Sequence, residues 1–198
     1  MIRLTICIPT VVGRENSCLR LVEDITSQIK QNGLEDKVEI LVDKDNKEVS
    51  IGVKRNRMYN DAKGIYSVQI DDDDSISIDY IYEVYIATLA GSDCIGYKER
   101  CLFDGKNPKI SDFSLKHRDW KEFKIPVSGC NYVRSPFCKT PILTSICRAV
   151  GVCDLRFGED HKFAQDVLPH LKTETYINKI MYHYFYKKED HNKKYGIK

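Results

Sequence analysis

The first 70 residues alternate apolar, strand-like runs with amphipathic helical segments, and this alternation restricts the fold more than any other feature. The predicted strands are Leu4–Pro9, Val38–Val42 and Ile65–Ile70. Between them, apolar residues from Cys18 to Ile29 recur at helical spacing, and Ser50 is a suitable N-cap for a second helix that ends before Gly64. Strands and helices that alternate with short connections form right-handed crossovers and a parallel sheet. The sequence therefore predicts an α/β fold with a mostly parallel central sheet flanked by helices.

Four consecutive aspartates, Asp71 to Asp74, directly follow the third predicted strand. Like charges about 6 Å apart repel by roughly 1 to 3 kcal/mol per pair at effective dielectrics between protein surface and water, so the cluster favours a cation. Mg²⁺ and Mn²⁺ are hard cations that prefer carboxylate oxygens. Alternate carboxylates at a strand end can point the same way, which makes Asp71 and Asp73 the predicted metal-binding pair. A solvated acidic turn is the alternative interpretation.

Polar residues stand at the carboxyl ends of all three predicted strands, namely Thr10, Asp43 and Asp71. The carboxyl ends of parallel strands meet at one edge of a sheet, where open α/β sheets bind their ligands. We therefore expect three widely separated segments to converge on one crevice.

The rest of the chain is predicted to complete the same domain. Further helices are predicted over 78–89, 141–150 and 159–171, and further strands over 94–97 and 176–186. Between residues 102 and 128 the periodicity is lost, and we expect irregular, substrate-specific loops there. Residues 187–198 form a polar, basic tail that we expect to fray.

Composition narrows the class of protein. With 198 residues and 42% hydrophobic content, the chain is long enough for one domain with a sizeable core. The formal net charge of +2 is too small to indicate a nucleic-acid or membrane partner by itself. No apolar run reaches 18 residues, and the eight cysteines include no C-x-x-C pair. We therefore expect a soluble, cytoplasmic protein with reduced, packed cysteines and no membrane partner.

Several motifs resemble those of the family 2 glycosyltransferases, which have the GT-A fold. They are the strand ending in Pro9-Thr10, the run Ile40-Leu41-Val42-Asp43, the run Gly52-Val53-Lys54-Arg55-Asn56 and the four aspartates. The later segments Gly151-Val152-Cys153-Asp154 and Phe157-Gly158-Glu159-Asp160 resemble that family's acceptor-side motif, in which an acidic pair opens a helix. The resemblance covers residues 1–90 and 150–170 and is to small soluble members, as found in viruses and phages.

The resemblance implies a metal-dependent, inverting glycosyltransferase with a nucleotide-sugar donor, expected to be a UDP-sugar. Residues 1–100 would form the nucleotide-sugar half of a single domain and residues 101–186 the acceptor half. By their matching positions, the donor would contact Thr10, Arg14, Asp43, Arg55, Asn56, Asp71 and Asp72.

The resemblance also implies the residues that carry the chemistry. Asp71 and Asp73, with His183 as a third ligand, would hold Mn²⁺ or Mg²⁺ against the diphosphate. Asp160 would be the catalytic base that takes the proton of the acceptor hydroxyl.

The acceptor is expected to be a saccharide or a hydroxylated base in DNA, as for some viral glycosyltransferases. The DNA hypothesis rests on the lysines of the tail and on the segment His117-Arg118-Asp119-Trp120-Lys121. Trp120, the only tryptophan, is interpreted either as a stacking platform for a sugar or base or as a packed aromatic.

Two other functions are compatible with the same motifs. One is a sugar nucleotidyltransferase, although such enzymes open with a glycine-rich loop and the segment from Pro9 to Glu15 has one glycine. The other is a non-catalytic nucleotide-binding or glycan-binding module, against which the intact Asp71, Asp73 and Asp160 argue.

Overall fold

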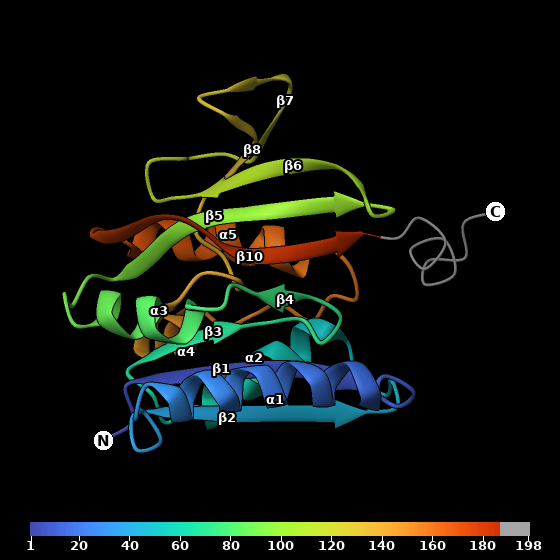
Figure 1. The fold of residues 1–198 in the computed structure, drawn as a ribbon, viewed down its shortest axis with the longest axis vertical. Coiled ribbons are helices and arrows are strands. Elements are labelled where there is room, and N and C mark those ends of the chain that lie inside the picture. Colours follow the sequence, from blue (N-terminus) through green and yellow to red (C-terminus); the bar gives the residue numbers. More distant parts are fainter. Residues whose placement is uncertain (187–198) are drawn as a thin grey trace.

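A ten-stranded mixed β-sheet runs through the molecule, with helices on both of its faces (Figure 1). The computed structural model describes residues 1–186. The strands are β1 (Leu4–Val11), β2 (Val38–Asp45), β3 (Tyr66–Gln69), β4 (Ser75–Ile76), β5 (Cys94–Phe103), β6 (Lys106–Phe113), β7 (Lys121–Val127), β8 (Cys130–Arg134), β9 (Ile142–Leu143) and β10 (Glu174–Tyr186). The helices are α1 (Glu15–Gln31), α2 (Ile51–Asp61), α3 (Tyr80–Thr88), α4 (Thr144–Val150) and α5 (Glu159–Val167), followed by the 3-10 turn η1 (Leu168–His170).

The predicted β-α-β-α-β unit is confirmed. β1 lies between β2 and β3 and pairs with both in parallel. Helices α1 and α3 pack against each other on one face, and α2, α4 and α5 pack together on the other (Figure 1). Because β1 is covered on both faces, nearly all of its side chains are buried, which explains its continuous apolar run.

The sheet changes character beyond β3. Its order is β2-β1-β3-β9-β5-β6-β8-β7, with β10 paired to both β4 and β5. β9 is antiparallel to β3 and β5, and β6 is antiparallel to β5, whereas β10 runs parallel to β5. The mostly parallel sheet predicted from the sequence is therefore mixed outside its first three strands.

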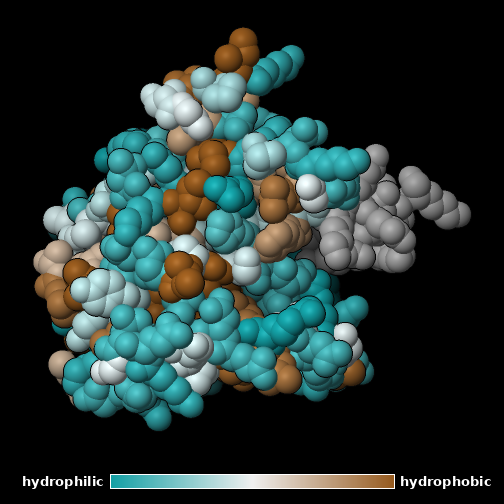
Figure 2. Space-filling view, viewed as in Figure 1, coloured by the Kyte–Doolittle hydropathy of each residue, from teal (hydrophilic) through white to brown (hydrophobic). Residues whose placement is uncertain are grey.

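The prediction of irregular loops between residues 102 and 128 is wrong. This region contains all of β6 and β7, which lie towards one edge of the sheet. The first half of β6 and nearly all of β7 are exposed, so neither strand shows the alternation of buried and exposed residues that marks a half-buried strand. The tip of this region carries exposed Ile125 and Val127. Figure 2, viewed as Figure 1, shows hydrophobic atoms at the top of the molecule, where Figure 1 places β7.

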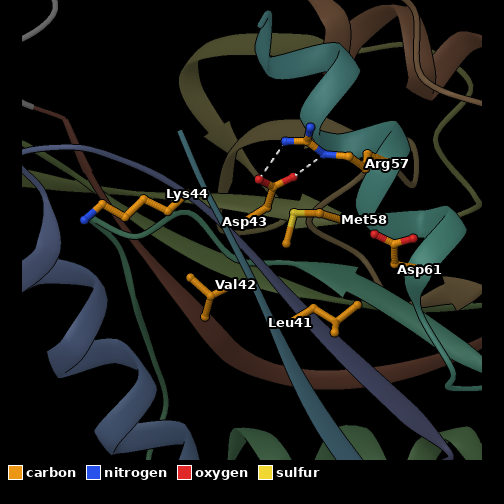
Figure 3. Close-up of a pocket in the computed structure, with 7 residues that line it drawn as sticks. All are labelled: Leu41, Val42, Asp43, Lys44, Arg57, Met58 and Asp61. Atoms are coloured by element: carbon orange, nitrogen blue, oxygen red, sulfur yellow. Dashed lines mark hydrogen bonds and ion pairs between the residues drawn. The ribbon is translucent and has the colours of Figure 1, made fainter. Parts of the chain in front are cut away.

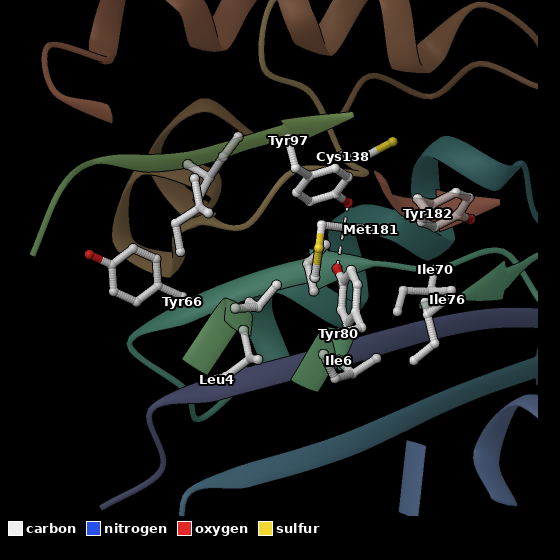
Figure 4. Close-up of a cluster of buried hydrophobic side chains, with 14 of the residues drawn as sticks. Leu4, Ile6, Tyr66, Ile70, Ile76, Tyr80, Tyr97, Cys138, Met181 and Tyr182 are labelled. Carbon is white, nitrogen blue, oxygen red and sulfur yellow. Dashed lines mark hydrogen bonds between the residues drawn. The ribbon is translucent and has the colours of Figure 1, made fainter. Parts of the chain in front are cut away.

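A cluster of buried aliphatic and tyrosine side chains joins the helices to the sheet (Figure 4). Tyr80 of α3 lies edge-on to Tyr97 of β5, with ring centroids 6.0 Å apart. The buried face of α3 is formed by Tyr80, Ile81, Val84, Ala87 and Thr88. Ile78, which the sequence placed on the apolar face of this helix, precedes α3 and is 88% exposed.

Seven of the eight cysteine side chains are buried and all eight are free, in agreement with the expectation of reduced, packed thiols. Among residues 1–186, no helix is long and apolar enough to cross a membrane.

The start of α2 is fastened to the segment that precedes α5. Ser50 caps α2 as predicted, because its Oγ accepts the backbone N–H of Val53 at 3.1 Å, and the same hydroxyl donates to Asp154 at 2.6 Å. The N–H of Gly52 donates to the Leu155 carbonyl at 3.1 Å. A Cβ atom on Gly52 would lie 1.9 Å from the carbonyl oxygen of Cys153. Glycine is therefore required here so that the two segments can touch.

We expect Gly52→Ala to lower the free energy of unfolding by about 1–3 kcal/mol, as overpacking commonly does. In an open helix the same change would stabilise the protein by about 1 kcal/mol, so the sign of the effect reports the backbone contact. Urea denaturation measures it, with Asn60→Ala on the exposed side of α2 as the control. A stabilised Gly52→Ala variant would show that the contact with Cys153 is absent in solution.

Candidate active site at the carboxyl edge of the sheet

The four aspartates alternate between exposed and buried positions. The side chains of Asp71 and Asp73 are 25% and 46% exposed, whereas those of Asp72 and Asp74 are each 1% exposed. A turn holds the run together, because the N–H of Asp74 donates to the Asp71 carbonyl at 3.1 Å. Two carboxylates thus remain available to solvent and two are used inside the protein.

Asp72 is held by residues that follow β1. Its Oδ2 accepts the Thr10 hydroxyl at 2.6 Å, and its Oδ1 accepts Nη1 of Arg14 at 2.6 Å. Burial raises the pKa of the Asp72 carboxyl, and the Thr10 hydrogen bond opposes this. The sequence placed Asp72 among the donor-contacting residues, but both of its oxygens are taken by neighbouring protein groups. Asp72 therefore positions Thr10 and Arg14 beside the exposed aspartates.

Asp74 is held by the last described strand and by Lys139. Its Oδ2 accepts the Tyr182 hydroxyl at 2.7 Å and the Lys139 ammonium at 2.9 Å, and its Oδ1 accepts the N–H of Phe185 at 3.1 Å. Burial raises the pKa of the Asp74 carboxyl, and the Lys139 charge opposes the shift.

The sequence analysis missed Lys139. Its Nζ also lies 3.5 Å from Asp71, and within 4.5 Å of the ring centroids of both Tyr182 and Tyr184. The one signal in the sequence is that Lys139 directly follows the apolar run Pro136-Phe137-Cys138, and a buried ammonium needs a carboxylate partner. The sequence does not indicate which carboxylate that is.

Arg55 connects the two acidic motifs of the chain. This buried guanidinium donates to Asp71 at 2.8 Å through Nη2 and to Glu159 at 3.3 Å through Nε. A third donor, Nη1, binds the side-chain oxygen of Gln69 at 3.1 Å. Burial raises the pKa of the Glu159 carboxyl, and Arg55 counteracts that shift. The end of β3 and the start of α5, distant in sequence, are thereby joined through one side chain.

Asp160 lies in the first turn of α5, beside Glu159 and within the electrostatic reach of Arg55. Its Oδ1 accepts the N–H of His161 at 2.7 Å. Asp160 makes no ion pair with the residues that the structure describes, whereas Glu159 is used by Arg55. Of the acidic pair, Asp160 is the one that remains partly exposed.

The side chains of Asp43 and Asn56 both bind other groups of the protein. β2 continues two residues beyond Asp43, and Asp43 makes a two-pronged ion pair with Arg57 at 2.7 and 2.8 Å beside a surface hollow (Figure 3). At the true end of β2, Asp45 pairs with Lys54, which also donates to the Thr10 carbonyl. Asn56 accepts the N–H of Val152 at 3.1 Å and so supports the loop before α5.

The structure does not bring His183 to the aspartates. Side chains alternate along a strand, and Tyr182 and Tyr184 point towards Asp74 and Lys139. His183 consequently faces the other side of β10. Within residues 1–186, no three His, Cys, Asp or Glu side chains gather closely enough to form a complete metal site.

In the segment His117–Lys121, His117 and Trp120 are partly buried, whereas Arg118, Asp119 and Lys121 are exposed. His117 pairs with Asp112 at 2.9 Å. The Trp120 ring lies 5.0 Å from Phe137 and 4.9 Å from His161, centroid to centroid. The structure therefore favours the interpretation of Trp120 as a packed aromatic. The tail lysines that also motivated the DNA hypothesis lie outside the described residues.

Comparison with known proteins identifies the fold. No family model and no curated protein sequence matches the chain. Solved structures of S. aureus TarS do match at 14% identity. TarS 1-349 in complex with UDP-GlcNAc gives a TM-score of 0.65 over 93% of this chain and 59% of that one, and its complex with UDP gives 0.64 over 98% and 63%. The chain thus spans about 60% of TarS 1-349. The GT-A fold expected from the sequence is confirmed.

Removing the Arg55 charge should be costly because it leaves buried Glu159 without its cation and Asp71 with only the more distant Lys139. We expect Arg55→Met to lower the free energy of unfolding by about 3–5 kcal/mol. Adding Glu159→Gln should recover part of that loss. The control is Arg57→Met, which breaks the half-exposed pair with Asp43 and should cost less than about 1 kcal/mol. Equal losses for the two arginines in urea denaturation would contradict a connecting role for Arg55.

Proposed function

We propose that this chain is a glycosyltransferase that binds a UDP-sugar at the carboxyl edge of β1, β2 and β3 and transfers the sugar to a hydroxyl group with inversion. The observation that carries the proposal is the Arg55 bridge, which joins Asp71 on the donor side to Glu159 beside Asp160. The likeness of the fold to TarS, solved with UDP-GlcNAc and with UDP, supports the donor class.

Arg14 is the residue best placed to meet the diphosphate. Its side chain is 39% exposed, and it stands as the N-cap residue of α1. A helix N-terminus favours phosphate because its first N–H groups lack partners within the helix. Nη1 of Arg14 donates to Asp72 at 2.6 Å and Nη2 donates to Asp73 at 2.8 Å. These two carboxylates already orient the guanidinium, so binding a phosphate would order little additional side chain.

Asp71 and Asp73 fit a hard divalent cation in type, charge and exposure. The edge gathers the carboxylates of Asp71–Asp74, Glu159 and Asp160 around three cationic side chains, Arg14, Arg55 and Lys139, which leaves an excess of negative charge. Mn²⁺ and Mg²⁺ often use one or two protein carboxylates and complete their coordination with phosphate oxygens and water. When bound, such a cation supplies Lewis acidity to the leaving diphosphate.

Asp160 is the proposed base. Its carboxylate lies in the first turn of α5, is partly exposed and can accept a proton from the acceptor hydroxyl. Glu159 is unsuited to this role because it is buried against Arg55. The acceptor would therefore bind beside the first turn of α5.

The two alternative functions differ from this one in their products. A glycosyltransferase given UDP-GlcNAc and a saccharide acceptor releases UDP and forms a glycoside. A sugar nucleotidyltransferase instead consumes a sugar phosphate and a nucleoside triphosphate and releases pyrophosphate. A binding module retains the nucleotide sugar and releases nothing.

Asp73→Asn should weaken Mn²⁺-dependent binding of UDP at least about tenfold, because one metal-facing carboxylate is neutralised. Isothermal titration calorimetry with and without Mn²⁺ measures this. Asp36→Asn, at an exposed pair with Lys37 remote from the site, is the control and should bind UDP normally. Unchanged UDP binding by Asp73→Asn would remove Asp73 from the proposed metal site.

Asp160→Asn should bind UDP normally but lose transfer by roughly 10²- to 10⁴-fold, the usual contribution of a general base. The matched control on the same helix is Asp166→Asn, whose carboxylate pairs with Lys162 at the surface. Single-turnover transfer from a radiolabelled UDP-sugar separates the two variants. Retained turnover in Asp160→Asn would assign the base to another residue.

A further inference from the structure

We propose that Arg134 forms an anion-binding subsite for the acceptor, and that the acceptor is a saccharide carrying a phosphate ester or carboxylate. The inference rests on the proposed function because it takes the acceptor to bind beside Asp160. It starts from a cation that the fold holds in place without giving it a counter-ion.

Arg134, the last residue of β8, is partly buried but lacks a carboxylate partner. The one hydrogen bond of its side chain among residues 1–186 is a long contact of 3.5 Å to the carbonyl of Val133, and the guanidinium makes no ion pair with any of these residues. Burial lowers the pKa of Arg134, and the charges of Glu99 and Glu122, which form no ion pair with it, oppose this shift only in part. An uncompensated, partly buried charge destabilises a fold, so its retention suggests a bound anion.

Aromatic rings fix the direction of the guanidinium. Its Cζ lies 4.7 Å from the centroid of the Trp120 ring and 5.2 Å from that of Tyr132. The Trp120 Nε1–H is itself a buried donor with no acceptor among the described residues. Two kinds of donor, guanidinium and indole N–H, therefore lie together with almost none of their hydrogen bonds made.

This group lies next to the proposed base. The Trp120 ring that packs against Arg134 also contacts His161, which follows Asp160 in α5. In the sheet, Arg134 is the strand partner of Phe113, and Phe113 is the strand partner of Tyr97. The Tyr97 hydroxyl donates to the carbonyl of Lys139. Arg134 therefore lies on the side of the four aspartates where the acceptor is proposed to bind, beside the first turn of α5.

The chemistry favours a single anionic group over a stacked base. A guanidinium offers paired donors that match the oxygens of phosphate or carboxylate. Tyr132 is only 7% exposed and Trp120 is packed on its neighbours, so these rings hold the cation and offer little surface for a nucleobase. The nearby Lys109 differs from Arg134, because it has a carboxylate partner in Glu122 at 3.6 Å.

The only tryptophan of the chain reports on this subsite directly. Its fluorescence is titrated with glucose 6-phosphate, glucuronate, glucose and a short single-stranded DNA, using the full chain without donor. We expect saturable changes with the two charged sugars and none with glucose. Arg134→Met should weaken the response at least about tenfold, because a charge-assisted hydrogen bond is lost, and Arg134→Lys should weaken it less. Arg20→Met on the exposed side of α1 is the matched control for loss of one positive charge.

The subsite is overturned if the charged sugars change the fluorescence of Arg134→Met as much as that of the unsubstituted chain. It is also overturned if glucose changes the fluorescence as much as the charged sugars do. A response to DNA alone that depends on Arg134 overturns the assigned ligand class in favour of nucleic acid. Thermal melting of each variant shows that it is folded. Calorimetry with UDP and Mn²⁺ on the same samples tests the proposed function separately. Loss of UDP binding with an Arg134-dependent sugar phosphate response would reject the transferase while retaining the subsite.

Discussion

The contact on which the site depends is the buried guanidinium of Arg55. It lies between the carboxylate that ends β3 and the carboxylate that begins α5, and it holds Gln69 as well. An ion pair of this kind adds little to net stability, because burying the charges costs about as much as their attraction returns. What it provides is a fixed relative position for two acidic segments that the chain separates by nearly 90 residues.

The four aspartates show how one sequence run can serve two purposes. The even-numbered pair is buried and bound by Thr10 and Arg14 on one side and by Tyr182 and Lys139 on the other. Asp71 and Asp73 remain partly exposed, because the buried pair holds the turn in place. Local repulsion is thus relieved by cations from three other segments, and the remaining negative charge stays at the surface.

The first three strands and two helices were predictable because burial on both sheet faces imposes an unmistakable apolar pattern. β6 and β7 were not predictable, because they lie near a sheet edge and their polar, exposed residues show no apolar strand pattern. Asp43 was misplaced for a related reason, because β2 continues to pair with β1 through the polar residues up to Asp45. The roles of Asp72 and Lys139 depend on contacts between distant segments, which no local pattern of a single sequence contains.

The way β10 closes the acidic edge has a consequence for biosynthesis. Phe185 donates its N–H to Asp74 across 111 positions of sequence, and Tyr182 reaches the same carboxylate. A ribosome releases Asp74 long before these partners, so a nascent chain of 100 residues carries Asp74 without the groups that bury it. Such long-range closure slows folding, and it makes the turn of four aspartates dependent on translation of the residues that follow it.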